Sequence, residues 1–373
     1  MQHVKDLPAK LKSKAGFDLK MLVGLDGFVD EIVHLVDKRQ DFANFSRIKT
    51  IAEYGDRISK AAGLSTNVEM VTVQTKLGGN GPILSNALLE FGVGLTYVGA
   101  LGVPDIHAVF RPMAQKAAEV FSLCDAGHTD ALEFEDGKIM MGKHACLFDL
   151  TWDVFKNGMG GAQNIAKKIS ECDLFGMENW TMLPHMSDIW QGLIDEVFPL
   201  LPQRETKPLA FFDLADPEKR TKDDILRAMQ LIGKFEKKFR AILGLNEKEV
   251  YEIADVFDLK ISDSQDKLEK TVMAVYDALG IYCLMVHPVR SACCALNGEF
   301  FYTDGPFCAK PVLTTGAGDN LNAGFCLAQS LGLDPLASLT LGVSTSGYYV
   351  RNAKSPTFEQ VIAFAEDWGN GKI

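Results

Sequence analysis

Short apolar runs alternate with longer segments of helical periodicity along most of the chain. Residues 174–177, 209–212, 241–243 and 284–286 are apolar runs with the length of buried strands, and helical segments separate most of them. Residues 21–24 form an earlier run of the same kind. Because strands that alternate with helices pack as a parallel sheet covered on both faces, the pattern predicts an α/β fold with a mostly parallel central sheet between two helical layers.

A different pattern interrupts this alternation in two stretches. Residues 131–139 and 143–150 alternate between apolar and polar positions, with a turn signal at Asp136-Gly137, and they predict paired strands. Residues 68–73 alternate in the same way, whereas residues 42–63 have helical periodicity. Since no Gly/Ser-rich linker sets these segments apart, we expect a small appendage inserted into the main domain rather than a tethered second domain.

The composition is that of a globular protein with a large core. The chain has 373 residues, 47% of them hydrophobic, and a net charge of −11 without a long basic run, which argues against nucleic-acid and anionic-membrane surfaces. Its eight cysteines form no C-x-x-C pair, and we interpret them as reduced core residues. The basic N-terminus lacks the apolar segment of a secretory signal, and no uncharged apolar run approaches about 20 residues. We therefore expect a cytoplasmic protein with no nucleic-acid or membrane partner.

The segment Gly316-Ala317-Gly318-Asp319 carries the strongest chemical signal. It lies between an apolar run and a helical pattern, where glycines let backbone N–H groups gather at a helix N-terminus. Such a site favours a phosphate or an oxyanion, and Asp319 beside it can accept a proton. Together they suit phosphoryl transfer to a hydroxyl. The plainer alternative is an ordinary capped helix.

Two further segments suit a small polar ligand. Gly78-Gly79-Asn80 opens a helical pattern that ends at Gly92, so a ligand could approach its backbone closely. Asp26 and Asp30 follow the first apolar run, and ligands of open α/β sheets bind beyond the carboxyl ends of strands. A carboxylate can accept two sugar hydroxyls. The alternatives are another capped helix and two solvated loop acids.

Residues 313–325, Leu-Thr-Thr-Gly-Ala-Gly-Asp-Asn-Leu-Asn-Ala-Gly-Phe, resemble the signature of the ribokinase/PfkB family of carbohydrate kinases. Residues 78–92 are similar to the first signature of that family, and Asn246-Glu-Lys-Glu249 is similar to its Asn-x-x-Glu element. The resemblance implies a ribokinase-like three-layer sandwich with a small β lid. We expect the core in residues 17–30, 77–127 and 160–373. The lid, with a helical insertion, is expected in residues 31–76 and 128–159.

The resemblance also implies a role for each matching residue. Asp319 would be the catalytic base, and Gly316, Ala317 and Gly318 would form the anion hole. The sugar would bind to Asp30, Asp26, Gly78, Gly79 and Asn80. Thr315, Asn246 and Glu249 would contact the nucleotide, and Glu249 would help to hold Mg²⁺. Asn246 and Glu249 also have the spacing of a capping box, which needs no ligand.

The implied activity is ATP- and Mg²⁺-dependent phosphorylation of a hydroxyl of a sugar or sugar acid, and a homodimer through the lid is a further expectation. A nucleoside kinase and a catalytically degenerate sugar-binding regulator are the alternatives, with a dehydrogenase more distant. No G-x-x-x-x-G-K-[ST] motif is present, which excludes a P-loop kinase. Three departures from the family pattern bear on the details, namely Ile83, Leu313 and the segment 286–292. They put in doubt the packing of the first helix, a monovalent-cation site and the adenine contacts.

Overall fold

The computed structural model describes residues 2–373. Its body is built on one nine-stranded sheet with the strand order β14-β13-β12-β11-β10-β9-β1-β5-β6. The strands from β12 to β6 in this order are parallel, and β13 and β14 add an antiparallel hairpin. The strands are β1 (Lys20–Leu25), β5 (Gly94–Gly99), β6 (Glu119–Ser122), β9 (Leu174–Met177), β10 (Leu209–Asp213), β11 (Arg240–Asn246), β12 (Cys283–His287), β13 (Ser291–Leu296) and β14 (Glu299–Asp304). The predicted mostly parallel α/β sheet is confirmed.

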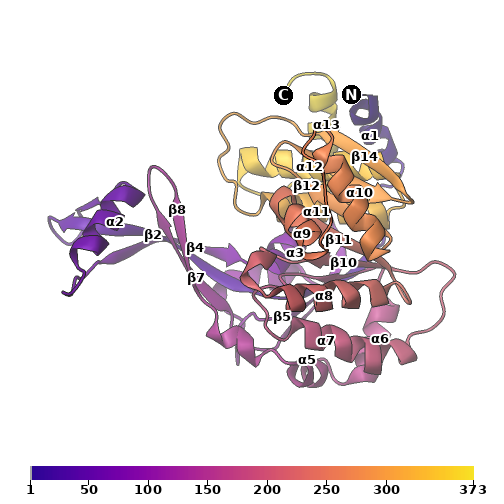
Figure 1. Ribbon diagram of the computed structural model, residues 1–373, viewed down its shortest axis with the longest axis horizontal. Coiled ribbons are helices and arrows are strands. Elements are labelled where there is room, and N and C mark those ends of the chain that lie inside the picture. The colour runs from indigo at the N-terminus through magenta and orange to yellow at the C-terminus, as the bar shows by residue number, and fades with distance from the viewer. Residues whose placement is uncertain (1) are drawn as a thin grey trace.

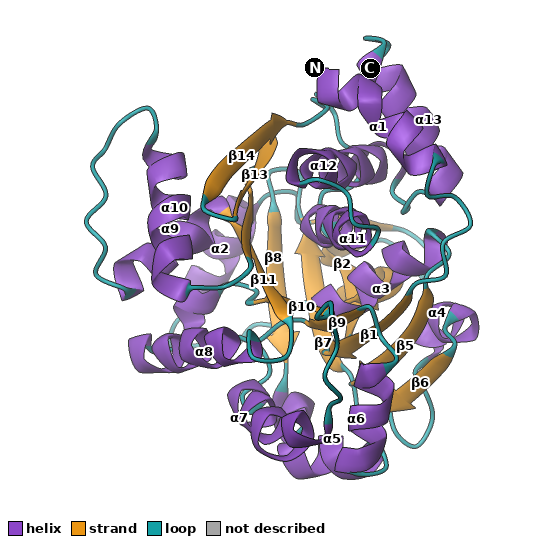
Figure 2. Ribbon diagram, turned by 90° about the vertical axis from the view of Figure 1, so that its right-hand side faces the viewer, coloured by secondary structure: helices purple, strands orange, loops and turns teal. Residues whose placement is uncertain are grey.

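Helices cover both faces of this sheet, as Figure 2 shows. One face packs against α1 (Gln2–Lys12), α3 (Asn80–Glu90), α4 (Arg111–Lys116), α11 (Ala317–Ser330), α12 (Pro335–Asn352) and α13 (Phe358–Gly369). The other packs against α5 (Trp152–Gly158), α6 (Ala162–Ser170), α7 (Met186–Gly192), α8 (Lys222–Phe235), α9 (Glu247–Val256) and α10 (Lys267–Leu279). Each layer encloses its own large apolar cluster, so the sheet is buried on both sides, as its near-continuous apolar strands require. Among residues 2–373, no helix combines the length and apolar character needed to cross a bilayer.

A second, smaller sheet projects from the body (Figure 1). Its strands are β2 (Phe28–Arg39), β3 (Phe45–Arg47), β4 (Met70–Gly78), β7 (Gly127–Glu133) and β8 (Lys138–Lys143). Central β2 pairs antiparallel with β4 and β3 and parallel with β7, and β8 borders β7. Helix α2 (Ile51–Lys60) covers one face over a cluster of Val33, Leu35, Ile48, Leu132 and Phe134. We call this sheet with α2 the lid sheet.

The expected strand over residues 143–150 is wrong, because β8 ends at Lys143 and a 3₁₀ turn follows at 145–149. Leu147 and Leu150 are buried in the core of the body, so their apolar spacing reflects packing against helices rather than alternation in a sheet. The helical segment is shorter than expected, since α2 spans Ile51–Lys60. The division into core and lid stays a prediction, and the packing of residues 145–159 places them with the body.

Candidate active site

The polar residues at the carboxyl ends of the central strands define the site. Asp26 follows β1, Glu178 follows β9, and Asp213 is the last residue of β10. Because parallel strands end at the same edge of a sheet, these three carboxyl groups gather there. The first turns of α3 and α11 reach the same edge, since Asn80 Nδ2 donates a hydrogen bond of 3.0 Å to Asp319 Oδ1. Two segments that are distant in the sequence therefore meet as one site.

Asp319 is a buried carboxyl in the first turn of α11. The pKa of Asp319 is raised to about 8, by burial first and then by the charge of Asp26, with the hydrogen bond from Asn80 acting in the opposite direction. Gly316, the N-cap residue, has φ 89° and no side chain that could cap the helix. A Cβ at this position would lie 3.0 Å from Tyr349 Oη and 3.2 Å from Ile83 Cγ2. The turn therefore needs glycine at position 316. Ile83, one of the positions that differ from the family pattern, packs against this glycine.

Asp26 is fully buried, and its carboxylate is occupied by the protein. Its oxygens accept hydrogen bonds from the backbone N–H groups of Asn80 and Gly81, each at 2.9 Å, and from Asn179 Nδ2 at 2.7 Å. Burial raises the pKa of Asp26, and the three donors limit this rise, so that its pKa is about 6. Asp26 therefore binds the N-terminal end of α3 through these hydrogen bonds.

Asp30 lies in β2 at the base of the lid sheet. It stands opposite Lys76 of β4 and Thr129 of β7. Burial raises the pKa of Asp30, and the charge of Lys76 and a hydrogen bond with Thr129 offset this in part. A Cβ at Gly78 would lie only 2.4 Å from Asp30 Cγ, so Gly78 makes room for this carboxylate. The predicted sugar-binding residues Asp30, Gly78 and Gly79 therefore lie close together, next to Asp26.

Sequence reasoning missed two carboxyl groups of this site. Glu178 is fully buried, and neither of its carboxyl oxygens has a hydrogen-bond partner among the described residues. Burial, with the charges of Asp213 and Asp319, raises the pKa of Glu178 well above its usual range. The pKa of Asp213 is raised in the same way, by burial first and then by the charge of Glu249, while Asn322 Nδ2 donates to it at 3.1 Å. Both residues end or follow apolar strands, so the rule that singled out Asp26 could have found them.

A cavity of about 620 Å³ opens beside the first turn of α11. Asn246, His287, Thr314, Ala317 and Gly318 are among the residues that line it, and Val289 and Phe307 are exposed at its rim. The predicted nucleotide-binding residue Thr315 is not among the lining residues. Its carbonyl oxygen accepts a hydrogen bond from the Tyr349 hydroxyl. The volume lies within the range of small-molecule sites, about 300–1,000 Å³.

Asn246 and Glu249 form the capping box that their spacing allows. Asn246 Oδ1 accepts from the Glu249 N–H at 2.9 Å, and Glu249 Oε2 accepts from the Asn246 N–H at 2.8 Å. Glu249 Oε1 also accepts from the Asp216 N–H at 2.8 Å. Each carboxyl oxygen therefore has one backbone donor and keeps a further lone pair.

An acidic cluster next to α9 does not fit a metal ion. Asp216, Glu218 and Glu252 lie close enough together to share one. Lys248 Nζ, however, already lies 3.1, 2.8 and 3.2 Å from these three carboxylates. The ammonium group of Lys248 offsets part of the negative charge and occupies the place that a cation would take.

The sequence profile of a family described as prokaryotic ketohexokinase matches residues 1–368. The chain belongs to that family. A ketohexokinase from Haloferax volcanii is 26% identical over 351 residues, which cover 94% of this chain and 91% of the relative. The kinase is thus a carbohydrate kinase of the ribokinase/PfkB family, as expected, and the family implies ATP as the cosubstrate.

Solved structures share the fold of the kinase at low sequence identity. Ribokinase from Thermotoga maritima superimposes with a TM-score of 0.63 at 17% identity, and the match covers 93% of this chain and 99% of that one. Arabidopsis thaliana ribokinase, complexed with ribose and ATP, gives a TM-score of 0.62 at 13% identity, over 94% of this chain and 98% of that one. The predicted ribokinase-like fold is therefore confirmed.

The high pKa of Asp319 predicts a pH-dependent cost to stability. A carboxyl group whose pKa is about 8 in the folded protein, against about 4 when unfolded, binds more protons when folded. Stability is therefore lost as pH rises from about 4 through about 8. Asp319→Asn removes this loss, so its melting temperature should exceed that of the wild type by a margin that grows over this pH range. Scanning calorimetry would measure it.

The control is Asp263→Asn, because the side chain of Asp263 is 93% exposed. Its difference from the wild type should stay nearly constant over the same range. A constant difference for Asp319→Asn would mean that this carboxyl titrates like a surface residue.

Proposed function

We propose that this kinase transfers the γ-phosphoryl group of ATP to a hydroxyl of a ketohexose, with Asp319 as the general base. The observation that carries the proposal is the buried Asp319 carboxyl in the first turn of α11, held by Asn80 from α3. The family match and the ketohexokinase relative support a ketohexose over the sugar acid and the nucleoside.

The proposed chemistry needs one free oxygen on Asp319. Oδ1 accepts the Asn80 amide, which leaves Oδ2 for the proton of the sugar hydroxyl. Because burial raises the pKa of Asp319 to about 8, its ionised form is a stronger base than a surface aspartate. The hydroxyl oxygen then bonds to the γ-phosphorus as the bond to the ADP oxygen breaks. With no side-chain cap at Gly316, the Gly318 and Asp319 N–H groups would stabilise the transferred charge, whereas the Ala317 N–H already donates to the Thr314 carbonyl.

The proposed sugar site lies between Glu178 and Asp30. Buried polar groups normally have partners, so the two unpartnered oxygens of Glu178 suit the hydroxyls of a bound sugar. Asp30 would contact the sugar from the lid sheet, over the Gly78-Gly79 turn. In this arrangement Asp26 acts through Asn80 as a positioning residue rather than as a sugar ligand.

The cavity of about 620 Å³ is the proposed ATP site. Mg²⁺ would supply charge neutralisation at the phosphates when it is bound. Asn246 forms part of the cavity wall, and the free lone pairs of Glu249 can accept hydrogen bonds from the water shell that Mg²⁺ keeps. The capping box and a water-mediated metal site are therefore compatible.

Asp319→Asn tests the base. It keeps the shape of the side chain and its acceptor for Asn80 but removes the proton acceptor. We expect kcat with a ketohexose to fall by about 10²–10⁴, the usual contribution of a positioned base, while the affinities for sugar and ATP change little. Turnover would be followed by ADP release, and affinity by calorimetry.

Asp30→Ala and Glu178→Leu are the contrasting variants, since leucine keeps much of the volume of Glu178 and removes its hydrogen-bonding atoms. Each should lower sugar affinity about ten- to a hundredfold, the usual result of losing a hydrogen bond to a charged or buried group. Near-normal turnover in Asp319→Asn would rule out the proposed mechanism. Unchanged sugar affinity in both contrasting variants would move the sugar site elsewhere.

Glu249→Gln tests the proposed metal role. The half-maximal Mg²⁺ concentration for turnover should rise because an amide holds the metal-bound water less strongly than a carboxylate. Sugar affinity measured without nucleotide should stay the same. Glu252→Gln is the matched control on the same helix. An unaltered Mg²⁺ titration in Glu249→Gln would leave only the capping role.

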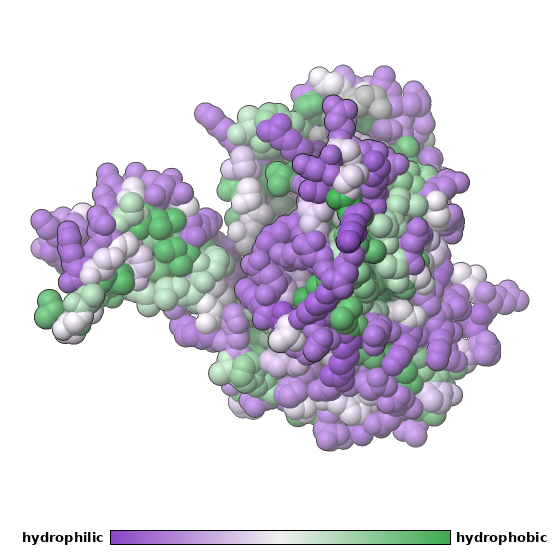
Figure 3. Space-filling model, in the orientation of Figure 1, coloured by the Kyte–Doolittle hydropathy of each residue, from purple (hydrophilic) through white to green (hydrophobic). Residues whose placement is uncertain are grey.

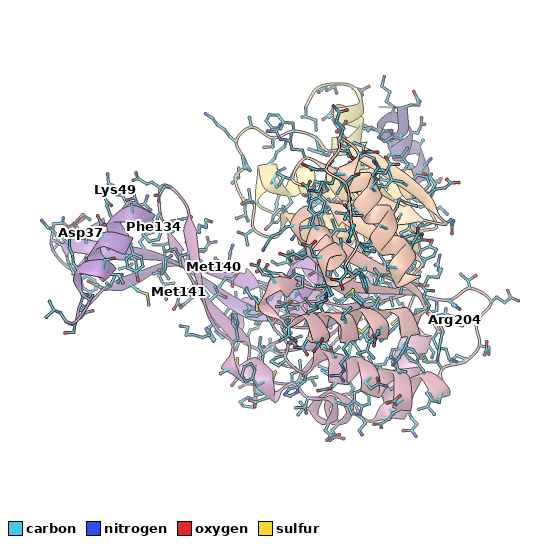
Figure 4. The ribbon with its side chains drawn as sticks, viewed as in Figure 1. Asp37, Lys49, Phe134, Met140, Met141 and Arg204 are labelled. Atoms are coloured by element: carbon cyan, nitrogen blue, oxygen red, sulfur yellow. The ribbon has the colours of Figure 1, made fainter. Side chains whose placement is uncertain are left out.

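The lid sheet is the proposed surface of a homodimer. Met70, Val73, Met140 and Met141 are each about half exposed, and the hydrophobic patch on this sheet is visible in Figure 3. Figure 4 places Met140 and Met141 on the border strand β8. A second copy of the chain would remove these apolar side chains from water.

Met140→Asp should shift the association equilibrium toward the monomer, because a desolvated charge opposes the contact. Sedimentation velocity over a range of concentrations would show it. Leu200→Asp, at a similarly exposed position on the body, should have no effect. A wild-type protein that stays monomeric throughout would exclude the dimer.

A further inference from the structure

We propose that His287 binds a phosphate group of the nucleotide, an inference that rests on the proposed ATP-dependent function. His287 is the last residue of β12, at the carboxyl edge of the sheet. It pairs in register with Asn246 of β11, and both residues line the cavity of about 620 Å³. Its ring therefore forms part of the wall of the proposed nucleotide site.

The ring lies against the first turn of α11. A Cβ at Gly318 would lie 3.0 Å from His287 Cε1 and 3.4 Å from Nε2. Gly318 therefore leaves the space in which the imidazole sits. The Ala317 N–H donates to the Thr314 carbonyl at 3.1 Å, whereas the Gly318 and Asp319 N–H groups have no backbone acceptor among residues 2–373, so an anion held by these two groups would lie within reach of Nε2.

Neither ring nitrogen of His287 has a hydrogen-bond partner in another residue from 2 to 373. Burial lowers the pKa of His287 to about 4, so the imidazole is neutral near pH 7 and carries one N–H donor. A neutral ring of this kind is suited to donating a hydrogen bond rather than a proton. The inferred role is therefore binding and orientation of a phosphate oxygen.

The rim of the cavity has a different character. Val289 is fully exposed there, and the guanidinium of Arg290 lies 4.9 Å from the centre of the Phe307 ring. An apolar side chain and a stacked ring suit a flat base rather than a phosphate. This separation assigns the phosphates to the end of the cavity with His287 and Gly318, and the base to the rim.

His287→Ala, compared with the wild type by calorimetry without sugar, tests the inference. Affinity for ATP with Mg²⁺ should fall about tenfold or more, as expected for loss of a hydrogen bond to a charged group. Affinity for adenosine should not change, because adenosine has no phosphate. His287→Gln places an N–H near the position of Nε2 and should recover most of the ATP affinity. His185→Ala, on a partly exposed histidine before α7, is the control.

Each other outcome overturns the assignment. Wild-type ATP affinity in His287→Ala would remove His287 from the site, and an equal loss for adenosine would make it a contact of the base. If His287→Ala does not fold, His287→Leu keeps the apolar volume and removes the donor, with the same expected results. Because the measurement needs no turnover, it is independent of the test of Asp319. Wild-type protein that binds neither ligand would contradict the proposed ATP dependence itself.

Discussion

The buried carboxylate of Asp26 is the interaction on which the site depends. It stands at the end of β1, yet it accepts hydrogen bonds from the first backbone N–H groups of α3 and from the side chain of Asn179 beyond β9. An unpaired buried charge would be costly, and these three donors favour the ionised form by lowering the pKa of Asp26 against the effect of burial. The same contacts fix the position of Asn80, whose amide reaches Asp319. One carboxylate thereby joins two strands and two helices.

This arrangement concentrates negative charge where water is scarce. Asp26, Asp213 and Asp319 each raise the pKa of at least one other carboxyl group of the site, and Glu178 receives this effect from all three, in addition to the effect of burial. Gathering these carboxyl groups in the interior lowers the stability of the folded protein at neutral pH. The residues responsible are those proposed to bind the substrate and accept a proton. The body offsets this cost with two large apolar clusters that bury the sheet on both faces. The destabilising groups are therefore confined to the site, while the two apolar clusters stabilise the fold.

The sequence was sufficient for the mostly parallel sheet and for the position of Asp26 beyond the carboxyl end of its first strand. The meeting of Gly78-Gly79 with Gly316–Asp319 could not be foreseen in that way, because Gly78 ends β4 of the lid sheet and no strand of the parallel sheet leads into Gly316. The role of Asp26 could not be foreseen, because it depends on Asn179, which approaches from a strand distant in the sequence. Glu178 follows β9 as Asp26 follows β1, so the same rule could have identified it. The strand expected at 143–150 failed since Leu147 and Leu150 pack against the body, which no local pattern reveals.

The lid sheet is tied to the same carboxylate. Strand β2 begins at Phe28, two residues after Asp26, and β4 ends at Gly78, two residues before Asn80. Two of the connections between the lid sheet and the body therefore lie on either side of the hydrogen bonds to Asp26. Next to them, the Gly127 N–H donates a hydrogen bond to the Gly27 carbonyl. The pairing of β2 with β4 stays regular through Asp30 and shifts only between Ile32 and Val33, where the irregularity bends the ribbon. Asp30 lies on the anchored side of that bend, so its distance from Asp319 is set by Asp26 rather than by the outer part of the lid sheet.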